Sequence, residues 1–181
     1  MVDKERRKKL AFHLRQLAAG RVTNEDFESA VADDVTYGWL PEQYYRSKEA
    51  KNDDPVMLPM LLACWGLYDD TRMDKLTGSA ELTREAKTII ARCILFLLSD
   101  REYEWPYFNA HSTLFRFLGS IGDIILTILT LGLHFIKENK RHLAAYEAWK
   151  NAGDYDVWPF FRSADYQEQL VRQPFLKANP A

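Results

Sequence analysis

Acidic side chains at positions 69, 70 and 74 of this 181-residue chain have types and spacing that suit metal chemistry. Asp70 and Asp74 are four residues apart, so a helix would project both carboxylates to one side, where with Asp69 they could share Mg²⁺. A small metal-dependent enzyme using Asp69, Asp70 and Asp74 is therefore one alternative. Arg72 and Lys75 lie alongside and could neutralise the acids, and we favour the interpretation of this cluster as a solvated helix end.

A second set of possible metal ligands recurs at intervals of four residues. On a continuous helix, His134, Glu138 and His142 would line one face and could offer nitrogen and oxygen ligands to a transition metal. Helical rise alone places the outer two about 12 Å apart, too far for a single ion, so only a neighbouring pair could bind. We favour a charged, solvated helix side here as well.

Other catalytic patterns are missing from the sequence. It contains no Gly-x-Ser-x-Gly elbow and no glycine-rich phosphate loop, and its two cysteines, Cys64 and Cys93, lie in apolar runs. The 24 Lys and Arg against 26 Asp and Glu provide no excess of positive charge for a nucleic acid. The basic run at residues 6–9 is predicted to be a solvated helix face. We therefore favour a non-catalytic protein without a cofactor, and we expect no nucleic-acid partner.

Two similar aromatic segments stand out, at residues 103–108 and 155–161. Each places a tyrosine and an acid before Trp-Pro and two further aromatic residues. Proline holds the residue before it in an extended conformation, so we expect both segments to be non-helical straps. The interpretation that we favour is that the straps cover the helical core. The alternative is a partner-binding surface formed by Trp105, Tyr107, Trp158 and Phe160, because Trp and Tyr are common interface anchors.

The elements that must position these residues are helical. Apolar residues recur at helical spacing along most of the chain, which predicts an all-α fold, a compact helical domain of about six to eight helices with two aromatic Trp-Pro connecting segments. The central helix is expected near residues 89–98. One domain is predicted over residues 1–181, comprising an N-terminal helical hairpin (1–34), central apolar helices (53–151) and an aromatic strap with a short C-terminal helix (152–181).

Helix boundaries follow from capping residues. Gly20 suits a left-handed helix stop, and Thr23 and Thr83 are expected to cap the helices that follow them. Asp53-Asp54-Pro55 predicts a helix start with proline in the first turn. Ser163 is expected to cap the last short helix.

The first hairpin has a family likeness. Residues 14–31, with Leu-x-x-Leu, then Ala19-Gly20-Arg21-Val22-Thr23 and Asp26-Phe27-Glu28, resemble the SHOCT-type helical hairpins that are appended to many bacterial proteins. The likeness covers about a tenth of the chain and implies a bacterial origin and a helical hairpin, with no activity attached.

Residues 117–136 form the longest apolar stretch, with Asp123 as the single charge. About twenty apolar residues can span a bilayer, so a membrane-associated protein anchored through residues 114–136 is a further alternative. Asp123 is costly in mid-span and Gly119 and Gly122 favour a break, so we favour a buried core helix. The charged N-terminus lacks the features of a secretory signal, and we expect a cytoplasmic protein.

The function that the sequence favours is binding of another protein, as an adaptor or an immunity-type protein would do. Near-neutral charge and abundant Trp and Tyr suit such a role. The identity of the partner, any substrate, the oligomeric state and the pathway are left open.

Overall fold

Residues 2–68, 71–106 and 133–173 are described by the structure, a computed structural model, apart from the side chains of residues 41–42, 133–139 and 141–142. The described residues are helical and contain no strand beyond an isolated bridge between Thr23 and Lys75, which confirms the all-α class. The α-helices are α1 (Lys4–Ala18), α2 (Asn24–Asp34), α3 (Pro41–Tyr44), α4 (Lys48–Asn52), α5 (Met57–Trp65), α6 (Arg84–Leu97), α9 (Leu133–Lys150) and α10 (Ser163–Arg172); short 3-10 turns occupy Gly78–Ala80 and Tyr155–Val157.

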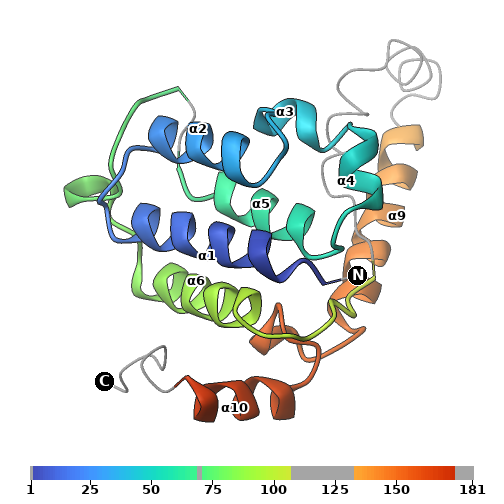
Figure 1. Cartoon of the computed structure of the whole chain (residues 1–181). Helices are drawn as coiled ribbons and strands as arrows, with labels where there is room; N and C mark the ends of the chain where they lie inside the picture. Colours follow the sequence, from blue (N-terminus) through green and yellow to red (C-terminus); the bar gives the residue numbers. More distant parts are fainter. Residues whose placement is uncertain (1, 69–70, 107–132, 174–181) are drawn as a thin grey trace. The chain divides into compact units, whose positions relative to one another are not determined.

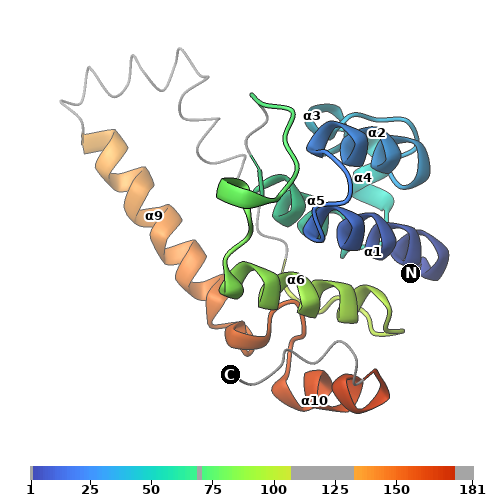
Figure 2. The same cartoon turned by 90° about the vertical axis from the view of Figure 1, so that its left-hand side faces the viewer.

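By their contacts the residues group into two units, which are described separately. The first unit holds Met1–Tyr103 and Val157–Ala181, and the second holds Glu104–Asp156. Within the first unit, α1 lies between α2 and α6, and α10 packs on α6 (Figures 1 and 2). Leu10, Leu14 and Leu17 of α1 are fully buried there, as the helical spacing predicts. The prediction of one domain over 1–181 stays a prediction.

The N-terminal hairpin is built by local capping. The N–H of Gly20 donates to the carbonyl of Leu17 and that of Arg21 to the carbonyl of Gln16, which is the Schellman arrangement with Gly20 at φ +62°. Thr23 then caps α2 in a capping box with Asp26. The predicted hairpin over residues 1–34 and both caps are confirmed.

The predicted core helix is α6. Ile90 and the run Cys93–Leu97 are buried, and Thr83 caps the helix by accepting a hydrogen bond from the N–H of Ala86. The apolar second half of α6 accounts for this burial, whereas Arg84, Glu85 and Lys87 in its first turn are exposed.

Two predicted helix starts are wrong. The helix expected at Asp53-Asp54-Pro55 begins at Met57 with Val56 at the cap position, and the buried Asp54 side chain pairs with Arg7 while also accepting from the N–H of Val56. Ser163 is the first residue of α10 rather than its cap, and Arg162 occupies the cap position, where its side chain makes no capping hydrogen bond.

Most of the apolar stretch 117–136 lies outside the described residues, so the choice between core helix and membrane anchor is not tested there. Among the helices of the described residues, none combines the length and hydrophobicity that crossing a membrane requires.

Candidate functional site: a buried arginine–aspartate network beneath an exposed aromatic loop

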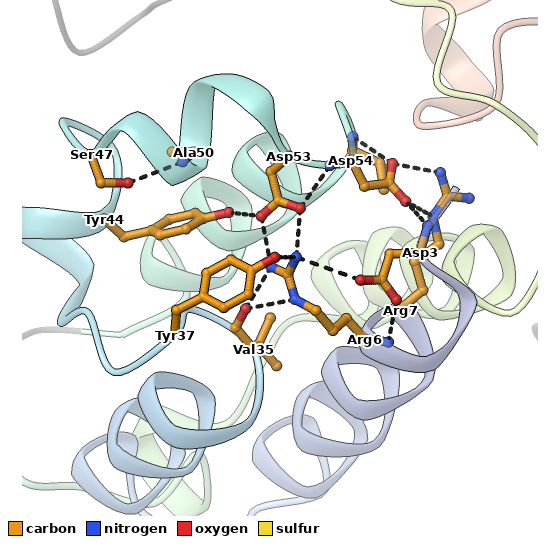
Figure 3. A network of polar contacts seen from close by, with 11 residues as sticks. Asp3, Arg6, Arg7, Val35, Tyr37, Tyr44, Ser47, Ala50, Asp53 and Asp54 are labelled. Atoms are coloured by element: carbon orange, nitrogen blue, oxygen red, sulfur yellow. Dashed lines mark hydrogen bonds and ion pairs between the residues drawn. The ribbon is translucent and has the colours of Figure 1, made fainter. Parts of the chain in front are cut away.

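Arg7 of α1 and Asp54, just before α5, form a bidentate ion pair in the interior of the first unit (Figure 3). Arg7 Nε lies 2.6 Å from Asp54 Oδ2 and Nη2 lies 2.8 Å from Oδ1, and both side chains are fully buried. The remaining groups are also satisfied, since Arg7 Nη1 donates to the Arg101 carbonyl and Asp54 accepts from the N–H of Asp3 and of Val56. The pair is thus a structural contact whose polar atoms bind other groups of the protein.

Arg6 makes a parallel pair with Asp53. Its Nη1 and Nη2 lie 2.5 and 2.6 Å from the two Asp53 oxygens, and Tyr44 donates its hydroxyl to Asp53 as well. Arg6 also donates Nε, at 2.9 Å, and Nη2, at 2.5 Å, to the carbonyl of Val35. The guanidinium therefore joins the end of α4 to the end of α2, as Figure 3 shows.

Opposite charges hold both aspartates ionised. Burial alone raises the pKa of Asp53, but hydrogen bonds from Arg6 and Tyr44 outweigh burial and lower it below the ordinary 3.8. Burial likewise opposes ionisation of Asp54, yet the hydrogen bonds from Arg7 and the Asp3 N–H lower its pKa. Burial and the Asp53 carboxylate raise the pKa of Tyr44, so its proton stays in place to donate.

The basic run at residues 6–9 is therefore only partly the solvated face that we predicted. Lys8 and Lys9 are exposed, but Arg7 is fully buried and the Arg6 side chain is 12% exposed. The burial of Arg7 could have been predicted from helical spacing. Arg7 stands three residues before Leu10 and seven before Leu14, on the buried side of α1.

Next to this network, the loop between α2 and α3 presents aromatic side chains at residues 36–40. Thr36 is buried and donates its hydroxyl to the Trp39 carbonyl at 2.6 Å, and the N–H of Gly38 donates to the Ala32 carbonyl at 2.7 Å. Tyr37, Trp39 and Leu40 are 58%, 38% and 48% exposed. The loop is internally hydrogen-bonded, and it holds these three apolar side chains toward solvent.

Tyr37 connects the loop to the network. It adopts φ +58°, a left-handed conformation that costs an ordinary residue about 1–2 kcal/mol. The Arg6 guanidinium lies 4.2 Å from the Tyr37 ring centroid and also bonds to its hydroxyl. A cation–π contact and a charge-assisted hydrogen bond, each worth on the order of 1 kcal/mol, offset that cost.

The network offers little scope for catalysis. Each buried carboxylate already faces a guanidinium, so neither is available as a general base or as a metal ligand. The thiols are unsuited as nucleophiles, because burial raises the pKa of Cys93 to about 12 and raises that of Cys64 well above its ordinary value. The exposed loop, by contrast, has the composition of a binding surface.

The predicted aspartate cluster is only partly described. Asp69 and Asp70 lie outside the described residues, and Asp74 is exposed. Asn24, at the start of α2, fixes this segment by donating to the Arg72 carbonyl at 2.7 Å and accepting from the Asp74 N–H at 3.0 Å. Within the described part of the chain no three His, Cys, Asp or Glu side chains gather in a way that could hold a metal.

The other predicted ligands, His134, Glu138 and His142, belong to α9. Their side chains lie outside the description, so the choice between metal ligands and the favoured solvated helix side is not tested.

The candidate anchor residues of the two Trp-Pro segments are buried or partly buried where the structure describes them. Phe160 is fully buried in the first unit and contacts Phe96 with ring centroids 5.1 Å apart, while the partly buried Trp158 donates Nε1 to the Tyr103 hydroxyl. In the second unit Trp105 is 4% exposed, and its ring centroid lies 5.0 Å from that of Trp149. Tyr107 lies outside the described residues. Burial of Trp105 and Phe160 accords with the covering role rather than with surface anchors.

Fold and site together define an all-α protein with a buried ionic network and a solvent-facing aromatic loop. No known family model, curated protein or solved structure matches the chain. The likeness of residues 14–31 to SHOCT-type hairpins therefore stays a proposal, although those residues do fold as a helical hairpin.

Proposed function

We propose that this protein binds another protein without catalysing a reaction, and that the side chains of Tyr37, Trp39 and Leu40 make the contact. The observation that carries the proposal is their joint exposure on a hydrogen-bonded loop. Tyr and Trp are the side chains that most often dominate binding energy at protein interfaces.

Rigidity of the loop supports the same role. A partner that meets a flexible loop must order it, which costs about 0.5–1.5 kcal/mol for each immobilised side chain. Here the Arg6 contact to Tyr37 and the Thr36 bond to Trp39 have already fixed the loop. Trp105 and Phe160, which the alternative interpretation of the sequence offered as anchors, are buried, so the exposed loop replaces them in this proposal.

The wider setting is proposed on similar grounds. An adaptor or immunity-type protein of a bacterial cytoplasm fits the near-balanced charge, 24 basic against 26 acidic residues, and the two free, buried cysteines. The acidic residues at 69, 70 and 74 are not needed for this role.

Affinity capture with matched variants tests the proposal. Wild type, Trp39→Ala and Phe12→Ala would be used as baits in lysate of the source organism and compared by quantitative mass spectrometry. Phe12 is the control, because it is 55% exposed on α1 and lies outside the loop. We expect a protein that wild type and Phe12→Ala retain and Trp39→Ala loses, and that binds purified wild type directly. Identical capture by all three baits would contradict the proposal.

A further inference from the structure

Charges flank the aromatic loop on both sides in the sequence, and those on the α2 side are acidic. Asp33 is exposed in the last turn of α2, where the helix dipole disfavours an acid. Its neighbour Asp34 is compensated by Lys9 at 3.1 Å and His13 at 2.8 Å. Asp33 forms no ion pair with any described side chain, so it remains an unfavourable charge in the isolated chain.

The α3–α4 side carries the opposite sign. Arg46, Lys48 and Lys51 are exposed, and none forms an ion pair within the described ranges. Arg46 instead lies over the Tyr45 ring, with its guanidinium 5.0 Å from the centroid. The exposed Glu49 offsets one of these three charges, and Glu42 adds a further acid to the α3 sequence. The described side chains over residues 46–51 therefore leave a net positive charge.

Along the chain, the aromatic loop thus lies between acidic Asp33 and the basic residues Arg46, Lys48 and Lys51. Figures 1 and 2 place α2, α3 and α4 along one edge of the first unit, and the loop joins α2 to α3. A surface with an apolar centre between opposite charges is complementary to itself. Rotation by 180° about an axis through the centre brings the acid of each copy toward the bases of the other.

We infer that the partner of this loop is a second copy of the same chain, docked across a twofold axis that passes between the two Trp39 side chains. Tyr37, Trp39 and Leu40 of each copy form the apolar centre, and Asp33 of each copy faces Arg46 and Lys48 of the other. This inference rests on the proposed function, because it names the occupant of the same surface. Three apolar side chains per copy make a small interface, so the dimer is weak and its population depends on concentration.

Sedimentation velocity of the full chain over a wide concentration range, at low ionic strength, tests the inference. We expect the weight-average mass of wild type and of Phe12→Ala to rise toward a dimer, and that of Trp39→Ala to stay monomeric. Added salt should weaken association, since exposed charge pairs are screened.

Charge reversal gives the sharper test. Asp33→Lys alone places a lysine against Arg46 across the axis, and Arg46→Glu alone places a glutamate against Asp33, so each variant should weaken self-association by at least about tenfold. In an equimolar mixture of the two variants, the introduced lysine faces the introduced glutamate, and the retained Arg46 faces the retained Asp33. The mixture should therefore associate like wild type, and circular dichroism would confirm that both exposed substitutions leave the fold intact.

Three outcomes would overturn the inference: a wild-type chain that is monomeric at every concentration, association that Trp39→Ala leaves unchanged, or a mixture that stays monomeric. Failure of this inference can be distinguished from failure of the proposed function. Trp39-dependent capture of a different protein by a strictly monomeric chain would retain protein binding and reject the second copy.

Discussion

Arg7 and Asp54, 47 residues apart in sequence, meet through two hydrogen bonds of 2.6 and 2.8 Å with both side chains shielded from water. Removing two charges from water is costly, and only near-ideal geometry with every remaining donor and acceptor satisfied compensates for it. The Arg101 carbonyl accepts from the third Arg7 nitrogen, and the N–H groups of Asp3 and Val56 bind the two Asp54 oxygens. The pair therefore imposes one specific fit between the start of α1 and the start of α5.

Replacing Arg7 by methionine should lower the free energy of unfolding by about 3–5 kcal/mol at neutral pH, because Asp54 would stay buried without its counter-charge. Lys8→Met is the matched control. Lys8 is exposed and, among the described residues, pairs with exposed Glu5 alone, so its loss should change stability by about 0.5 kcal/mol or less. Urea denaturation measures both. Equal effects of the two substitutions would show that Arg7 is not the buried partner described.

The stability of the fold should fall in acid. The folded pKa values of Asp53 and Asp54 lie below the ordinary 3.8, so their stabilisation is fully present above that value and is lost as the pH falls through the folded pKa values. In Arg7→Met the guanidinium that lowers the pKa of Asp54 is gone, so burial raises this pKa and the carboxylate takes up a proton at higher pH than in wild type. Urea midpoints measured from pH 7 to pH 3 should show the difference between wild type and this variant shrinking, and a constant difference would exclude the linkage.

Gly20→Ala should destabilise the protein more than Gly38→Ala. Both glycines have positive φ, which costs alanine about 1 kcal/mol. A Cβ at Gly20 would also lie 2.4 Å from Thr77 Cγ2, whereas a Cβ at Gly38 meets nothing within 4 Å. We expect losses of about 2–3 and about 1 kcal/mol, measured by thermal or urea unfolding. The reverse order would refute the packing of Gly20 against the segment before Gly78.

Asn24→Ala should cost about 1–3 kcal/mol, because the Arg72 carbonyl and the Asp74 N–H both lose a partly buried partner. Hydrogen exchange at the Asp74 amide should accelerate as well. Asn52→Ala is the control, since the exposed Asn52 side chain makes a local bond to the Lys48 carbonyl and no other within the described part of the chain. Unchanged exchange at Asp74 would mean that Asn24 does not hold this segment.

Local chemistry made the helices predictable, and long-range pairing made the site hard to foresee. The stop at Gly20 and the caps at Thr23 and Thr83 depend on neighbours within a few residues, so the sequence alone is enough to place them. Helical spacing places Arg7 on the buried side of α1, but no local pattern reveals that its partner is Asp54, 47 residues away.

For the loop at residues 36–40, the sequence predicts the backbone conformation but not the exposure of the side chains. Tyr37, Gly38 and Trp39 before Pro41 indicate a bend or a brief extended piece, but their exposure depends on Arg6 holding Tyr37 from a different helix. Trp105 and Phe160 show the converse, because their residue types suit an interface and tertiary packing buries them. Residue type indicates what a side chain can do, and only the fold decides whether solvent reaches it.

Two neighbouring arginines meet two neighbouring aspartates, each pair 47 residues apart. Since neither member of a buried pair tolerates loss of the other, evolution can change these positions only two at a time. Distant relatives should therefore keep Arg-Arg and Asp-Asp together or exchange a whole pair, even where every loop around them has diverged. That coupled spacing is a signature by which such relatives can be sought.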